Sequence, residues 1–145
     1  MKQAGKTSII TILGVVGALT IGILMFFGQE SPSTACTRFL DAMARGDVDA
    51  VVKNSFIEGV DDAKAKEQWT YTLKIAAPYY RFGWEILNTK VASETKASVE
   101  INFVRNIGSD MAYPERFGIP LEKKNGTWKV DVRSLPRKIF PSFPR

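Results

Sequence analysis

The chain has 145 residues, a length that suits one folded domain with additional terminal segments. Hydrophobic residues make up 45% and charged residues 24%, which is the balance of a folded protein. Histidine is absent and cysteine occurs once, so the sequence offers no imidazole for acid/base catalysis or haem binding, no zinc cluster and no intramolecular disulfide. We therefore expect no cofactor and no metal site.

The net charge of +5 is concentrated at the two ends of the chain. Residues 28–132 hold 14 of the 20 basic residues and all 15 acidic ones, so this part of the chain is slightly acidic. A nucleic-acid-binding domain would carry its excess of basic residues on the folded body. We therefore expect no nucleic-acid partner.

Residues 7–27 form an uncharged, largely apolar run of 21 residues. As a helix, at about 1.5 Å per residue, this run reaches across the hydrocarbon core of a bilayer, which is about 30 Å thick. It predicts a single transmembrane helix behind a cytoplasmic N-terminus, residues 1–6, because Lys2 and Lys6 precede it and positive residues favour the cytoplasmic side. The following residues would then be extracytoplasmic; in a bacterium they would extend from the inner membrane into the periplasm.

A cleaved signal peptide is the competing interpretation, since small residues at 33–35 resemble a cleavage site. We favour an uncleaved anchor because the apolar run exceeds that of a signal peptide, about 7–15 residues, and a polar linker, residues 28–33, follows it. Cys36 lies too far beyond the run to be a lipid-attachment site of the usual kind. We expect it to be a buried small residue, with an intermolecular disulfide or a lipidated thiol as alternatives.

Small residues share one face of the expected membrane helix. Thr7 begins the series, and the candidate helix-packing residues are Thr11, Gly14, Ala18 and Gly22. Small side chains let a second membrane helix approach closely, and van der Waals packing drives such association in lipid. The stripe predicts contact with transmembrane helices of partner subunits; a bare anchor without a helix partner is the alternative.

Three helices are predicted after the linker. The first covers about residues 33–45 and stops at Gly46, and the second is short and begins after the cap residue Asp47. The third covers about residues 61–77 and is ended by Pro78. The apolar positions recur at helical spacing and are expected to be buried: Ala35, Phe39, Leu40, Met43, Val48, Val51, Val52, Ala65, Trp69, Leu73 and Ala76.

The apolar period changes to two after residue 80, which predicts strands. The first covers about residues 83–91 and the second about residues 97–103. Two more strands are joined by Asn125-Gly126, the strongest short signal for a β-hairpin. A two-residue turn predicts the pairs Lys123 with Trp128, Leu121 with Val130, Ile119 with Val132 and Glu122 with Lys129. Pro120 lacks an N–H, so we expect it at an unpaired or edge position.

Helices followed by strands predict an α+β fold, in which a transmembrane helix precedes a domain of three helices packed on a bent antiparallel sheet. The phrases ACTRFLDAMARGDVDAVV and PLEKKNGTWKVD, with Gly46-Asp47 and the run Gly-Thr-Trp-Lys-Val at 126–130, resemble the nuclear transport factor-like superfamily, also called cystatin-like cones. The resemblance covers residues 34–132 and implies a cone-like domain. Its motifs mark a helix stop, a hairpin and a core tryptophan, so they imply no particular chemistry.

Enzymes of that superfamily resemble ketosteroid isomerase, scytalone dehydratase or polyketide cyclases and work in the apolar mouth of the cone. The dehydratase type relies on histidine, which this chain lacks. For an isomerase-like site the candidate carboxylate is Asp110 and the candidate hydroxyl donors are Tyr79 and Tyr80. Asp110 lies in a turn-like sequence and is expected to be solvated. We therefore expect no enzyme activity, and we expect the aromatic residues at 79–84 to pack in the core or at the rim of the cone.

Residues 133–145 form a basic, Pro-rich C-terminal tail, whose prolines exclude a helix or a central strand. A frayed terminus is one interpretation. We favour docking onto an anionic protein groove or a lipid surface, because exposed aromatic residues would be unusual in a free tail. The candidate docking residues are Arg137, Lys138, Ile139, Phe140 and Phe143.

These patterns predict a non-catalytic, single-pass membrane protein that is an accessory or scaffold subunit of a larger bacterial complex, of energy-transducing, photosynthetic, respiratory or secretion type. The expected partners are the lipid bilayer and the transmembrane helices and extracytoplasmic surfaces of other subunits. The alternative is a membrane-tethered binder, or isomerase-like enzyme, for a small apolar ligand in the cone. An open cavity with a buried carboxylate would favour the alternative, and a mouth filled by side chains would favour the scaffold.

Overall fold

The computed structural model describes residues 29–145, of which Ser31–Arg145 form one compact unit. The expected membrane span at residues 7–27 lies outside the described residues, and so do the expected packing positions Thr11, Gly14, Ala18 and Gly22. Within residues 29–145, no helix combines the length and the apolar character that crossing a bilayer requires.

The first two helices begin and end where the sequence predicts. Helix α2, Pro32–Arg45, begins at Ser31, whose hydroxyl accepts a backbone N–H of the first turn. It ends at Gly46, which has a φ of 65°, a left-handed conformation that glycine adopts without steric cost. Helix α3, Val48–Asn54, begins at the cap Asp47, whose carboxylate accepts another backbone N–H. The predicted apolar stripe of α2 is buried.

Near the C-terminal end of the third helix, the buried positions differ from the predicted apolar stripe. Helix α4, Asp62–Thr70, continues into a π-helical turn, η1, Tyr71–Ala76. The Ala77 N–H donates to the Thr72 C=O over 3.1 Å, which spans five residues instead of four. The wider turn rotates the following side chains, so Thr72 is buried and Ala76, which the regular period assigned to the core, is exposed.

The sheet has five strands in the order β1-β5-β4-β3-β2. They are β1, Ser55–Phe56; β2, Phe82–Val91; β3, Lys96–Arg105; β4, Pro114–Lys124; and β5, Thr127–Asp131. The prediction of a purely antiparallel sheet is wrong because β1 pairs with β5 in parallel, so the sheet is mixed. A strand of two residues is too short to produce an alternating pattern in the sequence.

The hairpin of β4 and β5 has the predicted register. Leu121 pairs with Val130, and the other two predicted pairs next to the turn, Glu122 with Lys129 and Lys123 with Trp128, are also formed. The predicted pair of Ile119 with Val132 is absent from the ladder, because β5 ends at Asp131. The N–H of Val132 donates instead to the C=O of Phe56 in β1, over 3.1 Å.

Pro120 limits the ladder on one side of β4. The Lys123 N–H donates to the Thr95 C=O on the β3 side, over 2.8 Å. Because N–H groups alternate in direction along a strand, position 120 directs its missing N–H toward β5. The β4–β5 ladder stops at the preceding pair, Leu121 with Val130. The expectation of an unpaired position for Pro120 is therefore confirmed on this side.

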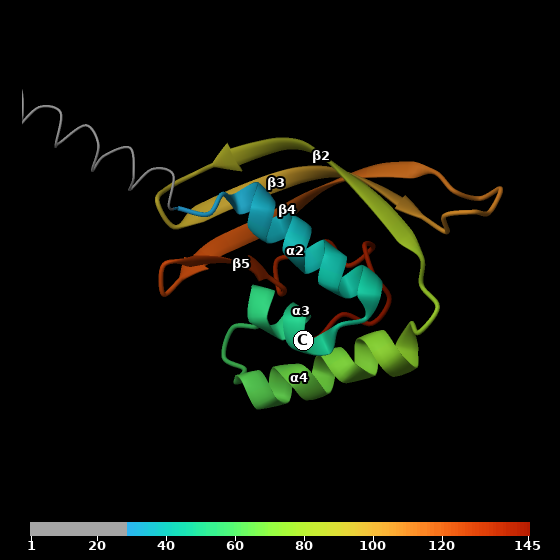
Figure 1. The fold of residues 1–145 in the computed structure, drawn as a ribbon, viewed down its shortest axis with the longest axis horizontal. Coiled ribbons are helices and arrows are strands. Elements are labelled where there is room, and N and C mark those ends of the chain that lie inside the picture. Colours follow the sequence, from blue (N-terminus) through green and yellow to red (C-terminus); the bar gives the residue numbers. More distant parts are fainter. Residues whose placement is uncertain (1–28) are drawn as a thin grey trace, which may run out of the picture. The chain divides into compact units, whose positions relative to one another are not determined.

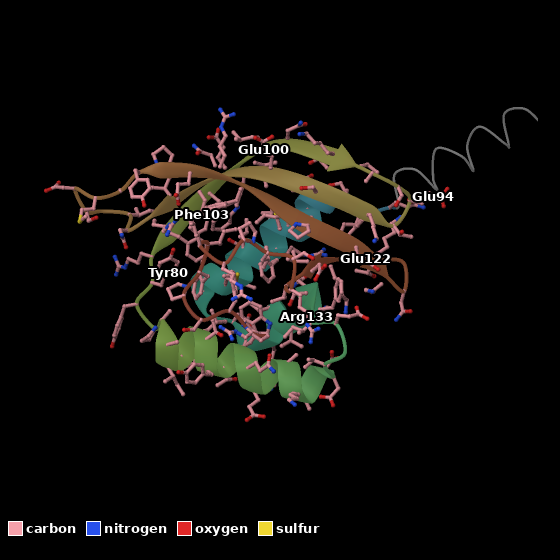
Figure 2. All side chains as sticks on the ribbon, turned by 180° about the vertical axis from the view of Figure 1, so that it is seen from behind. Tyr80, Glu94, Glu100, Phe103, Glu122 and Arg133 are labelled. Atoms are coloured by element: carbon pink, nitrogen blue, oxygen red, sulfur yellow. The ribbon has the colours of Figure 1, made fainter. Side chains whose placement is uncertain are left out.

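The three helices lie on one face of the curved sheet (Figure 1). On β3, buried Ile101 and Phe103 alternate with partly exposed residues, and Figure 2 shows Phe103 on the inner side of the sheet and Glu100 on the outer side. The register of β2 shifts between Ile86 and Asn88, where a bulge increases the bend of the strand. The curved inner face and α4 enclose a space that we call the mouth of the cone.

Cys36 lies in α2 and is fully buried, so its interpretation as a buried small residue is confirmed. Burial raises the pKa of the Cys36 thiol to about 12. We expect the folded protein at about pH 8 to resist a thiol-reactive dye, because the thiolate is the reactive form, and to react fully once it is unfolded in urea. Time courses of dye incorporation measure this difference, and fast labelling of the folded protein would contradict the structure.

Candidate functional site

The C-terminal segment, residues 133–145, lies between the sheet and α4 (Figure 1). Ile139 and Phe140 are buried, with exposed fractions of 1% and 3%, and Leu135 and Pro144 are buried as well. The expectation that Phe140 is an exposed docking residue is therefore wrong. The prolines do prevent regular structure, but burial of apolar surface holds the segment against its own domain. The apolar side chains of residues 133–145 therefore pack into the domain core, so this segment is not a separate tail.

Two side-chain hydrogen bonds hold the backbone of this segment. The Tyr80 hydroxyl donates to the Ile139 C=O over 2.8 Å, and the Thr72 hydroxyl donates to the Ser142 C=O over 2.6 Å. Burial raises the pKa of the Tyr80 hydroxyl, against the opposing positive charge of Arg105. The hydroxyl therefore stays protonated, and remains a donor, throughout the physiological pH range.

Aromatic side chains fill the mouth of the cone. The ring of Phe140 contacts Tyr80 edge-to-face at 4.6 Å between centroids, and it lies 5.9 Å from both Phe82 and Phe143. Phe143 in turn contacts Trp69 of α4 at 6.0 Å. Pairs of this kind contribute about 0.5–1.5 kcal/mol each beyond the burial of their area. Figure 2 shows Tyr80 on the inner side of the sheet.

The three residues proposed for an isomerase-like site are not brought together. Asp110 lies in an exposed turn between β3 and β4, which confirms its predicted solvated position. Tyr79 is 91% exposed, whereas the Tyr80 hydroxyl is engaged with the C-terminal segment. These residues therefore form no acid/base pair inside the cone.

The carboxylate of Glu115, at the start of β4, is close enough to Tyr80 for its charge to act on the Tyr80 hydroxyl. It is hydrogen-bonded and ion-paired to Arg105 at the end of β3. Burial lowers the pKa of the Arg105 guanidinium, but the hydrogen bond and the charge of Glu115 outweigh this effect, so the pKa is raised overall. Glu115 is thus held in a charge pair across two strands. In the part of the chain that the structure describes, no cluster of acidic, cysteine or histidine side chains is suited to hold a metal ion.

An open groove of about 950 Å³ lies along the outer side of the C-terminal segment, next to α4 and η1. Its apolar surface includes Phe140 and Phe143, which also fill the cone from the other side. Its basic side chains are Lys64, Arg133, Arg137 and Arg145. We call this feature the basic groove.

The sequence identified only part of the basic groove. Arg137 and Phe143 line it and were both predicted to dock a partner, whereas Lys138 is exposed and is not part of the lining. The contribution of α4 was missed. Lys64 and Tyr71 are seven residues apart, so the sequence alone places them on one helical face. This spacing did not indicate a binding site, because a polar helical face is usually only a solvated surface.

Comparisons with known proteins show a shared fold. No protein-family model and no curated protein matches this chain. A putative calcium/calmodulin-dependent protein kinase type II association domain from Thiobacillus denitrificans has a TM-score of 0.51 and 14% identity, over 70% of this chain and 90% of that one. This likeness supports the cone-like α+β domain that the sequence resemblance predicted, with three helices on a mixed sheet.

Two other similar structures have lower scores. A ketosteroid isomerase-like protein from Erwinia carotovora atroseptica has a TM-score of 0.48 and 18% identity, over 68% of this chain and 86% of that one. An NTF-2-like protein of unknown function from Shewanella oneidensis has a TM-score of 0.46 and 16% identity, over 69% of this chain and 94% of that one. Identities this low carry no information about chemistry.

Phe140 is the central side chain of the filled mouth, so we expect Phe140→Ala to be strongly destabilising. Removal of a buried phenylalanine side chain costs about 3–5 kcal/mol. Urea unfolding followed by tryptophan fluorescence measures this loss. Tyr79→Ala is the matched control, because Tyr79 is almost fully exposed and its removal should leave the unfolding midpoint nearly unchanged. Equal midpoints for Phe140→Ala and the unaltered protein would show that the segment is not part of the core.

Proposed function

We propose that the chain is a non-catalytic, single-pass membrane subunit, with its N-terminus in the cytoplasm and its cone-like domain outside it. In this role it is an accessory or scaffold of a larger bacterial membrane complex. The observation that supports the proposal is the filled mouth of the cone: Ile139 and Phe140 are buried there, in contact with the domain's own aromatic side chains. A domain whose interior is filled offers its outer surfaces for binding.

The membrane anchor is proposed from the sequence. Residues 7–27 are long enough and apolar enough to span a bilayer, and Lys2 and Lys6 orient the span. The small-residue stripe that includes Gly14 and Gly22 would allow close packing against a membrane helix of another subunit.

The alternative function, a tethered binder or isomerase-like enzyme for a small apolar ligand, requires an emptied mouth. A ligand would have to displace Phe140 and Ile139 and break the hydrogen bonds from Tyr80 and Thr72. Asp110, the candidate base, would still face solvent. The free-energy cost of this displacement and the absence of a positioned base argue for the scaffold.

One end of the domain carries an exposed apolar surface that suits protein contact. The loops at residues 77–81 and 106–113 meet there, where the Asn106 N–H donates to the Arg81 C=O over 3.0 Å. Large hydrophobic side chains are exposed on these loops: Tyr79, Ile107, Met111 and Tyr113. Figure 2 places Tyr80 near this end and Glu94, in the β2–β3 hairpin, at the opposite end. Apolar residues gathered on a surface are typical of contacts with other proteins.

Membrane anchoring and helix packing can be tested together. We expect the full chain to fractionate with the inner membrane and to bring its partner subunits along when it is purified in a mild detergent. Gly14→Leu combined with Gly22→Leu should reduce partner recovery several-fold while the protein stays in the membrane, because bulky side chains prevent close helix approach. Quantitative mass spectrometry of the co-purified proteins measures the change.

The matched control, Gly17→Leu, adds the bulk of a leucine side chain to the same expected helix but outside the small-residue stripe, and should recover partners normally. Unchanged recovery with both glycine substitutions would contradict the helix-packing part of the proposal. Recovery of the protein in the soluble periplasmic fraction, beginning near Cys36, would contradict the anchor itself.

A further inference from the structure

The basic groove holds positive charge that the protein does not neutralise. Four cationic side chains line it, against one carboxylate, that of Glu67. Among residues 29–145, neither Lys64 nor Arg133, Arg137 or Arg145 forms an ion pair. Some basic residues elsewhere on the domain do have acidic partners, as Lys66 does in Asp49 at 2.7 Å, and others do not. Unpaired like charges around a hollow with apolar walls focus the electrostatic potential there and attract anions.

The surface of the groove is suited to more than a simple anion. Half-buried Phe143 presents an apolar floor between the cationic side chains, with the buried Phe140 packed against it, and Tyr71, which is 56% exposed, stands at its side. The Gln68 side chain also lines the groove, but its Oε1 is buried. A ligand that used the whole groove would carry negative charges and apolar groups.

The shape of the groove distinguishes between possible anionic partners. A bilayer surface is broad and does not enter a concave groove, whereas an extended protein segment can lie along it. A volume of about 950 Å³ is at the upper end of the range for small-molecule sites, about 300–1,000 Å³. Several cations spaced around the floor also match several separate carboxylates better than a single head group.

We propose that the basic groove binds an extended acidic segment of a neighbouring subunit, with at least one aromatic or aliphatic side chain on the apolar floor that half-buried Phe143 presents. The carboxylates of the segment pair with Arg133, Arg137 and Lys64. This inference deepens the proposed scaffold function and rests on it, since it names the chemistry of the contact that the extracytoplasmic domain makes.

The test uses the full chain in nanodiscs of neutral phosphatidylcholine. The probe is a fluorescently labelled short peptide that alternates Glu with Leu and Phe, and binding is measured by fluorescence anisotropy. We expect binding that weakens as salt is added, and that weakens about tenfold or more when Arg133→Glu and Arg137→Glu are combined. Both side chains are exposed, so the fold should not depend on them; urea unfolding checks this.

The matched control, Lys90→Glu with Lys96→Glu, makes the same change of charge on exposed residues that do not line the groove, and should bind the peptide as the unaltered protein does. Equal peptide affinity in the groove and control variants, or no binding to the unaltered protein, would overturn the proposal. Binding to phosphatidylglycerol vesicles through Arg133 and Arg137, without peptide binding, would also overturn it in favour of a lipid head group. Membrane fractionation and partner recovery are read separately, so a failure here is distinguishable from a failure of the anchored-scaffold function.

Discussion

The domain depends on the packing of its last residues into its own concave face. Phe140 contacts Tyr80 at 4.6 Å between ring centroids and reaches Phe82 on the sheet, while Phe143 reaches Trp69 on α4. A curved sheet and a helix placed opposite it leave an apolar space that must be filled by side chains, by water or by a ligand. In this protein the chain supplies the filling itself.

The filled mouth distinguishes this domain from a cone-like fold that holds a ligand. It also changes which side chains the domain presents on its outer surface. The apolar face of the C-terminal segment is turned inward, so its basic residues are left outside, beside α4. The basic groove therefore results from the same packing that closes the mouth: Phe140 and Phe143 contribute to both. A filled interior and a charged exterior are therefore physically linked in this domain.

Local patterns in the sequence predicted most of the fold. Gly46 and Asp47 marked a helix stop and a helix start, and Asn125-Gly126 determined the register of the β4–β5 hairpin, because each of these signals acts within a few residues. What escaped prediction depends on distant contacts. The pairing of β1 with β5 joins residues far apart in the chain, and the burial of Phe140 depends on rings from α4 and β2 that no local period reveals.

The interlocking of early and late parts of the chain affects how the domain can fold during synthesis. A ribosome releases the helices and β1 well before β5, the parallel neighbour of β1, and before residues 133–145. Until then Trp69 and Phe82 line an unoccupied apolar hollow, a state in which chains aggregate or recruit chaperones. Because contacts between distant residues form slowly, this apolar surface stays exposed until residues 133–145 have been synthesised and have packed onto it.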